Sequence, residues 1–342
     1  MDTTTTFGAR RVARAGAAGV AALAALTAGL AVAGPAGATS TGTTAAVASD
    51  TLTVISGRAA DRLALRLAPG DATQLQVDVG DDGTAEHTFD RATFSRIVVD
   101  SGAGDDSLRI DQANGAFADE AITVFAGSGN DTFSGGDGAE VYFGGSGRDS
   151  ADPNRGDDTG VMGSGQDTFR WDPGDGSDHI EGQAGFDTLD FNGAAANENM
   201  QLVPNGERAL FLRDVANIRM DMDDVERLDL TALGGSDTML VGDMTGTDFR
   251  QADIDLSGPA GGGDGSLDTV TVTGSDAPDR VAVRADGTGV DVTGLRVADH
   301  VSGAEPTDKL QVNTGDGRDR VNVDPAAQAL IQVGIDLGAG QF

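Results

Sequence analysis

Alternating polar and aliphatic positions mark the two flanks of the chain. Residues 53–66 (TVISGRAADRLALR) and 271–284 (TVTGSDAPDRVAVR) share one pattern, and residues 97–111 and 310–324 share another. This period of two predicts β-strands with one buried face. Asn205-Gly206 also lies between two alternating runs, which is a hairpin signal. The flanks are therefore predicted to be β-strand-rich coils.

The centre of the chain, residues 125–191, follows a repeat of nine residues instead. Acidic residues recur at this interval, with one two-residue insertion before the last two, at Asp131, Glu140, Asp149, Asp158, Asp167, Asp178 and Asp187. A glycine lies two positions before each acid, at Gly129, Gly138, Gly147, Gly156, Gly165, Gly176 and Gly185. A second glycine lies four positions before five of the acids, at Gly127, Gly136, Gly145, Gly163 and Gly174, and Asn154 and Gln183 replace it in the other two repeats.

Each repeat also offers one position for a core side chain, two residues after the acid. Five of the seven are large and apolar: Phe133, Tyr142, Phe169, Ile180 and Leu189. Ala151 and Gly160, at the other two, are poor core residues, and Pro153 interrupts the strand after Asp149. The pattern predicts very short strands that each bury one side chain.

This arrangement resembles the RTX (hemolysin-type) nonapeptide repeat, G-G-x-G-x-D-x-U-x, over about a fifth of the chain. The resemblance implies an all-β parallel β-roll or β-helix, in which alternate turns line two edges and Ca²⁺ ions lie between stacked turns. The glycines and acids named above are then the metal-binding residues. One edge carries Asp131, Asp149, Asp167 and Asp187, and the other carries Glu140, Asp158 and Asp178.

The residue types agree with calcium as the cofactor. Glycine permits the tight turns that bring backbone carbonyls close together, and aspartate adds a hard oxygen. Calcium requires six to eight oxygens, more than one short turn supplies, so turns that lie two repeats apart must share an ion. One extracellular-type site adds about 1.4 kcal/mol at a calcium concentration ten times its Kd, and four or five sites add roughly 6–7 kcal/mol.

Departures from the repeat leave an alternative open. The side chain of Glu140 is longer than that of aspartate and fits such a site less well. The alternative is a degenerate roll that keeps the shape but binds little metal. Isolated Gly-x-Gly-x-Asp turns at Asp106 and Asp319 lack a neighbouring turn two repeats away, so whether they bind metal is open.

These patterns divide the chain into a series of segments. Residues 257–269 are expected to be a loop with solvated acids, and a degenerate turn ends at Asp237. The predicted segments are a signal peptide (1–38), a flexible linker (39–50), an N-terminal β-rich region (51–122), the RTX-like roll (123–192) and a C-terminal β-rich region with degenerate repeats (193–342).

The N-terminus predicts export. Arg10, Arg11 and Arg14 precede an apolar run, and Ala36-Gly37-Ala38 fits signal peptidase cleavage after residue 38. A membrane anchor is the alternative for the apolar run, and the arginine pair permits either the Sec or the twin-arginine route. The mature protein is expected to be secreted, with no membrane association after cleavage.

Net charge and cysteine content limit the classes of partner that the protein can bind. The formal net charge of −32, from 55 acidic and 23 basic residues, disfavours nucleic acid and anionic membranes and favours cations. The absence of cysteine excludes disulfides and thiol catalysis. Calcium ions, and cell-envelope or matrix components, are the partners that this composition favours.

No catalytic motif is visible. The chain contains three histidines, His87, His179 and His300, and one lysine, Lys309, and none lies in a nucleophile, zinc or phosphate motif. We expect a non-enzymatic, calcium-binding structural protein. The alternatives are a calcium-dependent polysaccharide lyase or epimerase on a β-helix scaffold, and a surface-layer component that uses calcium to bridge acidic surfaces.

Overall fold

Two β-sheets make up nearly all of the ordered structure. The computed structural model of the chain describes residues 42–287 and 289–339. Within these ranges the chain forms 28 strands, divided equally between two sheets, and three short 3-10 turns, η1 (Arg91–Thr93), η2 (Val215–Asn217) and η3 (Ala327–Ala329). The all-β prediction is confirmed.

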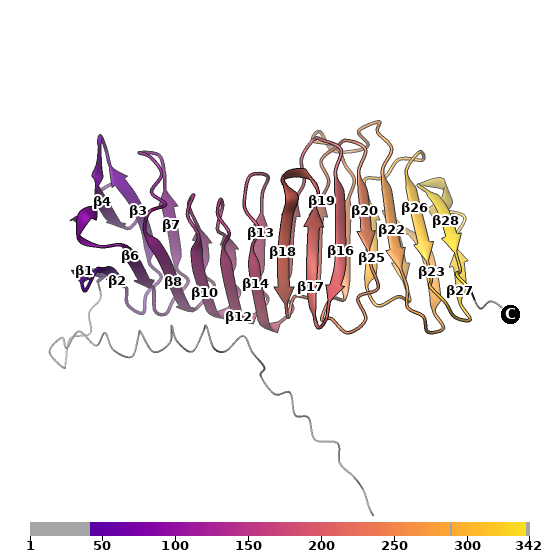
Figure 1. Cartoon of the computed structure of the whole chain (residues 1–342), viewed down its shortest axis with the longest axis horizontal. Coiled ribbons are helices and arrows are strands. Elements are labelled where there is room, and N and C mark those ends of the chain that lie inside the picture. Colours follow the sequence, from indigo (N-terminus) through magenta and orange to yellow (C-terminus); the bar gives the residue numbers. More distant parts are fainter. Residues whose placement is uncertain (1–41, 288, 340–342) are drawn as a thin grey trace, which may run out of the picture. The chain divides into compact units, whose positions relative to one another are not determined.

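The first sheet holds the strands that open each coil (Figure 1). In spatial order they are β1 (Thr44–Ala48), β2 (Thr51–Ile55), β6 (Arg96–Asp100), β8 (Ala121–Ser128), β10 (Glu140–Gly147), β12 (Thr159–Gly165), β14 (His179–Gly185), β18 (Ile218–Asp223), β17 (Arg208–Arg213), β16 (Asn199–Asn205), β20 (Thr238–Val241), β22 (Thr269–Thr273), β26 (Lys309–Asn313) and β28 (Gln332–Asp336).

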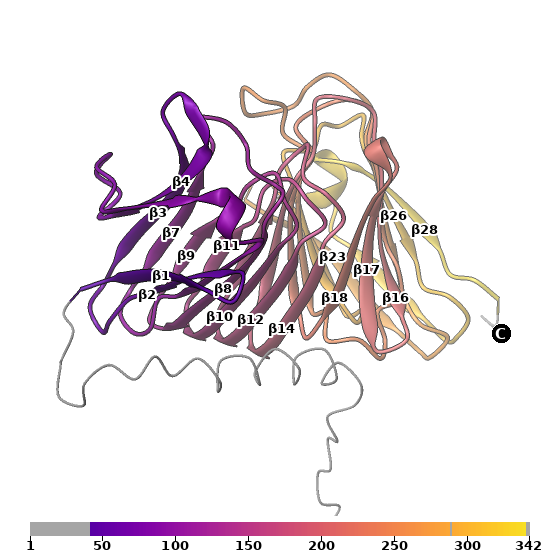
Figure 2. The same cartoon turned by 60° about the vertical axis from the view of Figure 1, so that its left-hand side comes forward.

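The second sheet faces the first across the core (Figure 2). From the opposite end its strands are β27 (Arg320–Val323), β23 (Arg280–Asp286), β24 (Gly289–Thr293), β25 (Ala298–Ser302), β21 (Gln251–Asp255), β19 (Arg227–Thr231), β15 (Thr188–Asn192), β13 (Thr168–Trp171), β11 (Ser150–Asp152), β9 (Thr132–Ser134), β7 (Ser107–Asp111), β3 (Arg62–Ala68), β4 (Asp71–Val79) and β5 (His87–Asp90).

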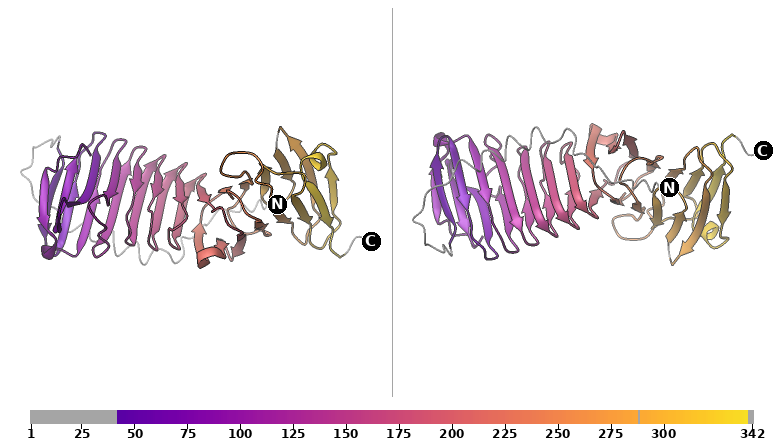
Figure 3. Two further views of the ribbon diagram at one scale, coloured as in Figure 1. Left: turned by 90° about the horizontal axis from the view of Figure 1, so that it is seen from above. Right: turned by 90° about the horizontal axis from the view of Figure 1, so that it is seen from below.

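The chain alternates between the sheets, so that consecutive coils stack in parallel. In the centre one coil corresponds to two repeats of the sequence, as Gly127 pairs with Gly145 and Gly145 with Gly163. Figure 3 shows these rungs from above and below. A parallel roll with two edges, as the nine-residue period predicts, is therefore the observed architecture.

Antiparallel hairpins interrupt the stack at three places. β3–β4, β16–β17 and β23–β24 each reverse the chain within a sheet. The predicted hairpin at Asn205-Gly206 is confirmed, with Asn205 opposite Arg208. The two pairs of similar flank sequences also share a topology, because β3 and β23 each pair with an antiparallel strand on one side and a parallel strand on the other.

One expectation about the segments is corrected. The flexible linker predicted at 39–50 contains β1, which pairs antiparallel with β2 from Thr44 opposite Ile55 to Ala48 opposite Thr51. The run of threonine and alanine resembles low complexity in the sequence, but β2 gives it a partner. The predicted signal peptide lies outside the described residues, and no helix among those that are described has the length and apolarity to span a membrane.

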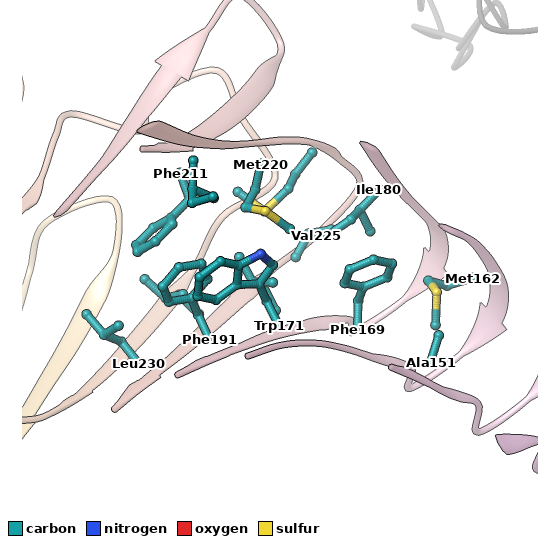
Figure 4. Close-up of a cluster of buried hydrophobic side chains, with 14 of the residues drawn as sticks. Ala151, Met162, Phe169, Trp171, Ile180, Phe191, Phe211, Met220, Val225 and Leu230 are labelled. Carbon is teal, nitrogen blue, oxygen red and sulfur yellow. The ribbon is translucent and has the colours of Figure 1, made fainter. Parts of the chain in front are cut away.

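The core between the sheets is apolar and continuous along the stack. Phe133, Tyr142, Phe169, Ile180 and Leu189, the predicted core residues of the repeats, are all at most 2% exposed. The rings of Trp171 and Phe191 stack 4.1 Å apart (Figure 4).

The small residues of the repeat have a packing role. A Cβ on Gly160 would lie 2.7 Å from the Phe169 ring, so the glycine makes room for that ring. Ala151 is fully buried. The two weak core positions of the repeat are therefore sites of close packing.

Candidate metal centre

On both edges of the stack, an acidic residue directly precedes or begins most of the strands. Most of these acidic residues are buried. We call the turns that lead into the second sheet edge one, and the turns that lead into the first sheet edge two. Edge one carries Asp61, Asp106, Asp131, Asp149, Asp167, Asp187, Glu226, Asp279 and Asp319, and edge two carries Glu120, Glu140, Asp158, Asp178, Glu198, Asp237, Asp268 and Asp308.

On edge one, hydrogen bonds join the acids of successive coils. The backbone N–H of Asp131 donates to Oδ1 of Asp149 at 2.9 Å, and that of Asp149 to Oδ1 of Asp167 at 2.8 Å. The same bond continues from Asp167 to Asp187 at 2.9 Å. One oxygen of each carboxylate is thus used to hold the preceding coil.

This ladder extends beyond the nine-residue repeats. Asp61 donates to Oδ1 of Asp106 at 2.7 Å, and Asp106 to Oδ1 of Asp131 at 2.8 Å. Asp187 donates to Oε2 of Glu226 at 2.8 Å. Asp106, predicted to be an isolated turn, therefore has stacked neighbours on both sides, but they lie 45 and 25 residues away.

Edge two repeats the geometry with fewer members inside the roll. The N–H of Glu140 donates to Oδ1 of Asp158 at 2.6 Å, and that of Asp158 to Oδ1 of Asp178 at 2.9 Å. After Asp178 the three-stranded insertion β16–β17–β18 separates the coils. The ladder resumes at Glu198, whose N–H donates to Oδ1 of Asp237 at 2.8 Å.

The second oxygen of these aspartates is the feature that points to a cation. It is buried and has no hydrogen-bond partner in Asp106, Asp131, Asp149, Asp158, Asp167, Asp178, Asp187 and Asp237. A buried carboxylate oxygen without a partner is strongly unfavourable. Hard divalent cations such as Ca²⁺ prefer carboxylate and carbonyl oxygens, so the donor set fits calcium.

Glycines bring backbone oxygens to the same edge. Gly147 has φ 135°, and a Cβ there would overlap the carbonyl oxygen of Gly129 in the preceding coil. A Cβ on Gly144 would lie 2.6 Å from Oδ2 of Asp149. Any larger residue at either position would push the coils apart or displace the carboxylate.

The positions where the repeat lacks its first glycine keep the same backbone. Asn154 has φ 61° and Gln183 has φ 70°, in the left-handed region that glycine favours. Gly127, Gly145, Gly163 and Gly174 adopt positive φ at the corresponding positions. Gly136 does not adopt positive φ, so six of the seven turns share this backbone, whether or not the residue is glycine.

Burial favours the protonated form of these carboxyls. It raises the pKa of Asp149, Asp178 and Asp187 to about 7 and that of Asp158 to about 9, with neighbouring acids adding to the effect. A cation that supplies positive charge next to the free oxygens lowers these pKa values again. Metal binding on both edges is therefore coupled to proton release.

Glu140 differs from the aspartates. Its Oε2 accepts the backbone N–H of Gly136 at 3.1 Å, so the longer side chain folds back onto its own turn. It is 2% exposed, and burial raises its pKa to about 7. This position offers no fully free oxygen of the kind found at Asp149.

Two buried acids on edge two are paired with arginine instead. Nε of Arg91 donates to Glu120 at 2.6 Å. Nε of Arg213 donates to Glu198 at 2.5 Å, and its guanidinium lies 5.2 Å from the Trp171 ring centroid. These arginines stand on either side of the run Glu140–Asp158–Asp178.

Sequence reasoning missed part of this arrangement. The sequence places Asp268 in a loop of solvated acids, but the residue is 3% exposed because it directly precedes β22. Asp308 and Glu198, each 1% exposed, carry no glycine signal either. The available signal is an acid placed directly before a strand with period two, as in Asp268-Thr269-Val270.

Two further clusters of acids carry no sequence signal either, one on the second sheet and one in the edge-one turns that lead into β19 and β21. Asp286, Asp291 and His300 bring ligand atoms together on the outer face of the second sheet, where Nδ1 of His300 lies 2.7 Å from Asp291. Asp223, Asp224 and Asp248 form the other cluster.

Comparison with known proteins agrees with the central geometry. Residues 123–151 and 172–190 match the RTX calcium-binding nonapeptide repeat, in four copies. Repeats of this kind bind Ca²⁺ structurally and form a parallel β-roll. No curated protein matches the chain. The segment between the two matches, 152–171, continues the same register and hydrogen bonds.

Proposed function

We propose, on the premise that residues 123–151 and 172–190 are RTX calcium-binding repeats, that this is a secreted structural protein whose central roll is ordered by Ca²⁺. The observation that carries the proposal is the row of buried aspartate oxygens without partners on both edges. Asp131, Asp149, Asp167 and Asp187 hold ions on edge one, and Asp158 and Asp178 on edge two. Stacked glycine carbonyls supply further ligands.

The proposed biological role is in the cell envelope or at the cell surface. RTX repeat proteins are typically secreted, and the net charge of −32 gives the protein a strong affinity for cations. Calcium outside the cell, at about 1 mM, is sufficient to fill sites of the affinity found in extracellular modules. The central roll would then be fully ordered only after export.

A calcium titration of the mature chain tests the proposal. At pH 8 in excess chelator the roll should be less stable and give a weaker β signal in circular dichroism than in calcium, and the signal should grow cooperatively at about 0.1–1 mM calcium. Magnesium should substitute poorly, because it prefers a smaller octahedral shell. Full β signal in chelator, unchanged by calcium, would contradict the proposal.

We also propose that the protein is not an enzyme. His179 is engaged with Glu181 at 2.6 Å and His300 with Asp291 at 2.7 Å, and Lys309 is exposed at the start of β26. Lys309→Ala should leave calcium binding unchanged. Calcium-dependent cleavage of an acidic polysaccharide that is lost in this variant would support the lyase alternative instead.

A further inference from the structure

The outer face of the second sheet carries one imidazole beside two carboxylates. Asp286 ends β23, Asp291 lies in β24 and His300 lies in β25. One ligand atom from each of the three side chains lies within 4.8 Å of the other two. The three strands are neighbours in an antiparallel part of the sheet, where Asp291 lies opposite His300. The strand register, rather than a short sequence motif, therefore brings these side chains together.

A glycine in the hairpin makes room for the imidazole ring. Gly289 lies opposite Asp286 in the β23–β24 pair. A Cβ on Gly289 would lie 2.5 Å from Cε1 and 2.7 Å from Nε2 of His300, so the ring occupies the space that a side chain would need. Nδ1 of the same ring lies 2.7 Å from Oδ1 of Asp291. The ring thus has one nitrogen beside Asp291 and the other against Gly289, the residue opposite Asp286.

A histidine on the first sheet offers a direct comparison. His179 in β14 also lies beside a carboxylate, with Nε2 2.6 Å from Oε1 of Glu181. The guanidinium of Arg208 lies next to both, 3.3 Å from Nδ1 of His179 and 2.7 Å from Oε1 of Glu181. This histidine–carboxylate pair therefore has an arginine of the chain beside it, whereas the pair on the second sheet has a second carboxylate.

The charged neighbours on the same face leave this second pair without a bound counter-ion. Arg284 lies opposite Asp291 and is exposed, and no ion pair joins the two within the described part of the chain. Asp253 lies opposite His300 on its other side and is engaged with Arg227 at 2.5 Å. The two carboxylates beside the imidazole are therefore available to a cation from solution, although the positive charge of Arg284 opposes its binding.

We propose that Asp286, Asp291 and His300 bind one Zn²⁺ ion, which clamps the β23–β24 hairpin to β25. One imidazole nitrogen and two carboxylate oxygens suit zinc better than calcium, which prefers oxygen ligands alone. A tetrahedral zinc holds neighbouring ligand atoms about 3.3 Å apart, a spacing that small rotations of these exposed or half-buried side chains provide. None of the three ligands belongs to the stacked acids of either edge, so the site is separate from the proposed calcium sites.

Calorimetric titration of the calcium-saturated mature chain with ZnCl₂ is the first test. His300→Gln should weaken zinc binding about 100-fold and leave the number of bound calcium ions unchanged. The side chain of His300 is 34% exposed, so the variant should fold, and Asp286→Asn at the exposed end of β23 provides a second variant. His179→Gln is the matched control and should bind zinc like wild type. Wild-type zinc affinity in both His300→Gln and Asp286→Asn would overturn the proposal.

Two neighbouring positions test the geometry while keeping all three ligands. The methyl group of Gly289→Ala takes the space of the His300 ring and should weaken zinc binding about tenfold. Arg284→Gln removes the opposing positive charge and should strengthen zinc binding a few-fold. The same titration measures both changes. Unchanged zinc affinity in both variants would show that the ion binds elsewhere.

Hydrogen exchange of wild type measures the clamp itself. Zinc at ten times its Kd should slow amide exchange in β24 and β25 about tenfold where exchange requires the ion-free state. Exchange in β14, which carries His179, is the internal control and should not change. The roll variant Asp149→Asn should show the same zinc-dependent slowing as wild type, which separates this site from the calcium roll. Equal exchange of β24 and β25 with and without zinc in wild type would contradict the clamp.

Discussion

Glu198 and Asp149 hold equivalent places before a strand, yet their charges are balanced differently. Glu198, 1% exposed, meets the guanidinium of Arg213. Asp149, also 1% exposed, has one oxygen on a backbone N–H and the other without a partner. The coil of Glu198 carries its own cation, whereas the coil of Asp149 needs one from solution. One fold can therefore contain coils whose buried acid is neutralised by an arginine of the chain and coils whose buried acid depends on a cation from solution.

The largest expected effect comes from removing a built-in cation. Arg213→Ala leaves Glu198 buried and unpaired, which should lower the free energy of unfolding by about 3–5 kcal/mol. Because the pair needs no metal, the loss should be equal in calcium and in chelator, measured by denaturant unfolding. Arg219→Ala, which removes an exposed arginine 2.8 Å from Asp221, is the control and should have little effect. A loss seen only in calcium would show that Arg213 acts through a metal site.

Removing a carboxylate with a free oxygen from the roll should change the stability by a smaller amount. The change should be destabilising in calcium but neutral or stabilising in chelator. Asp149 adjoins the turns of both Asp131 and Asp167, so Asp149→Asn should weaken two calcium sites. At ten times the Kd this is a loss of about 2.8 kcal/mol. In chelator the same change should be neutral or stabilising, since it removes the charge from a buried carboxylate whose Oδ2 has no partner. Thermal melts in both conditions check this, and equal losses in both would contradict it.

A change of pH should act on the roll through its buried aspartates. In chelator, the folded roll holds protons on Asp149, Asp178 and Asp187, whose pKa of about 7 lies above the unfolded value of about 3.9. That contribution is complete below about pH 4 and is lost as the pH rises through 7. Between these two pKa values, each group should therefore lower the free energy of unfolding by roughly 1 kcal/mol for each unit by which the pH rises.

Calcium should reverse the pH trend. Protons compete with the ion, so calcium affinity should fall when the pH is lowered from 8 to 5.5. Urea unfolding and calorimetric titration at both pH values measure the two slopes. A chelated roll that is more stable at pH 8 than at pH 5.5 would contradict the raised pKa values.

The nine-residue register and the parallel roll were predictable from the sequence because their signals are local. Gly145 and Asp149 lie within one turn, and the next copy on the same edge follows two repeats later. The C-terminal coils gave no such signal, since the β16–β17 hairpin, the loop 257–267 and the β23–β24 hairpin place 39, 31 and 40 residues between stacked acids. Asp268 therefore resembled a loop acid. The pairing of Glu198 with Arg213 depends on an insertion that brings β17 beside β16, which no local pattern encodes.

The smallest expected effect is at Glu140. Its Oε2 already accepts the N–H of Gly136, so Glu140→Gln should affect at most one site, by less than about 1.4 kcal/mol in calcium. Calorimetric titration beside Asp149→Asn compares the two edges directly. Equal losses of calcium for the two variants would show that the edges bind alike.

Because the register of the roll is constant, the stack can be lengthened or shortened by whole coils. Because Gly127 faces Gly145 and Gly145 faces Gly163, the surfaces above and below each coil are nearly interchangeable. Removing residues 131–148 would join Asn130 to Asp149 and present the next coil in the same register, whereas removing a single repeat would turn every later strand into the opposite sheet. Such a stack can grow or shrink by duplication only in steps of two repeats, and each step carries its own place for an ion.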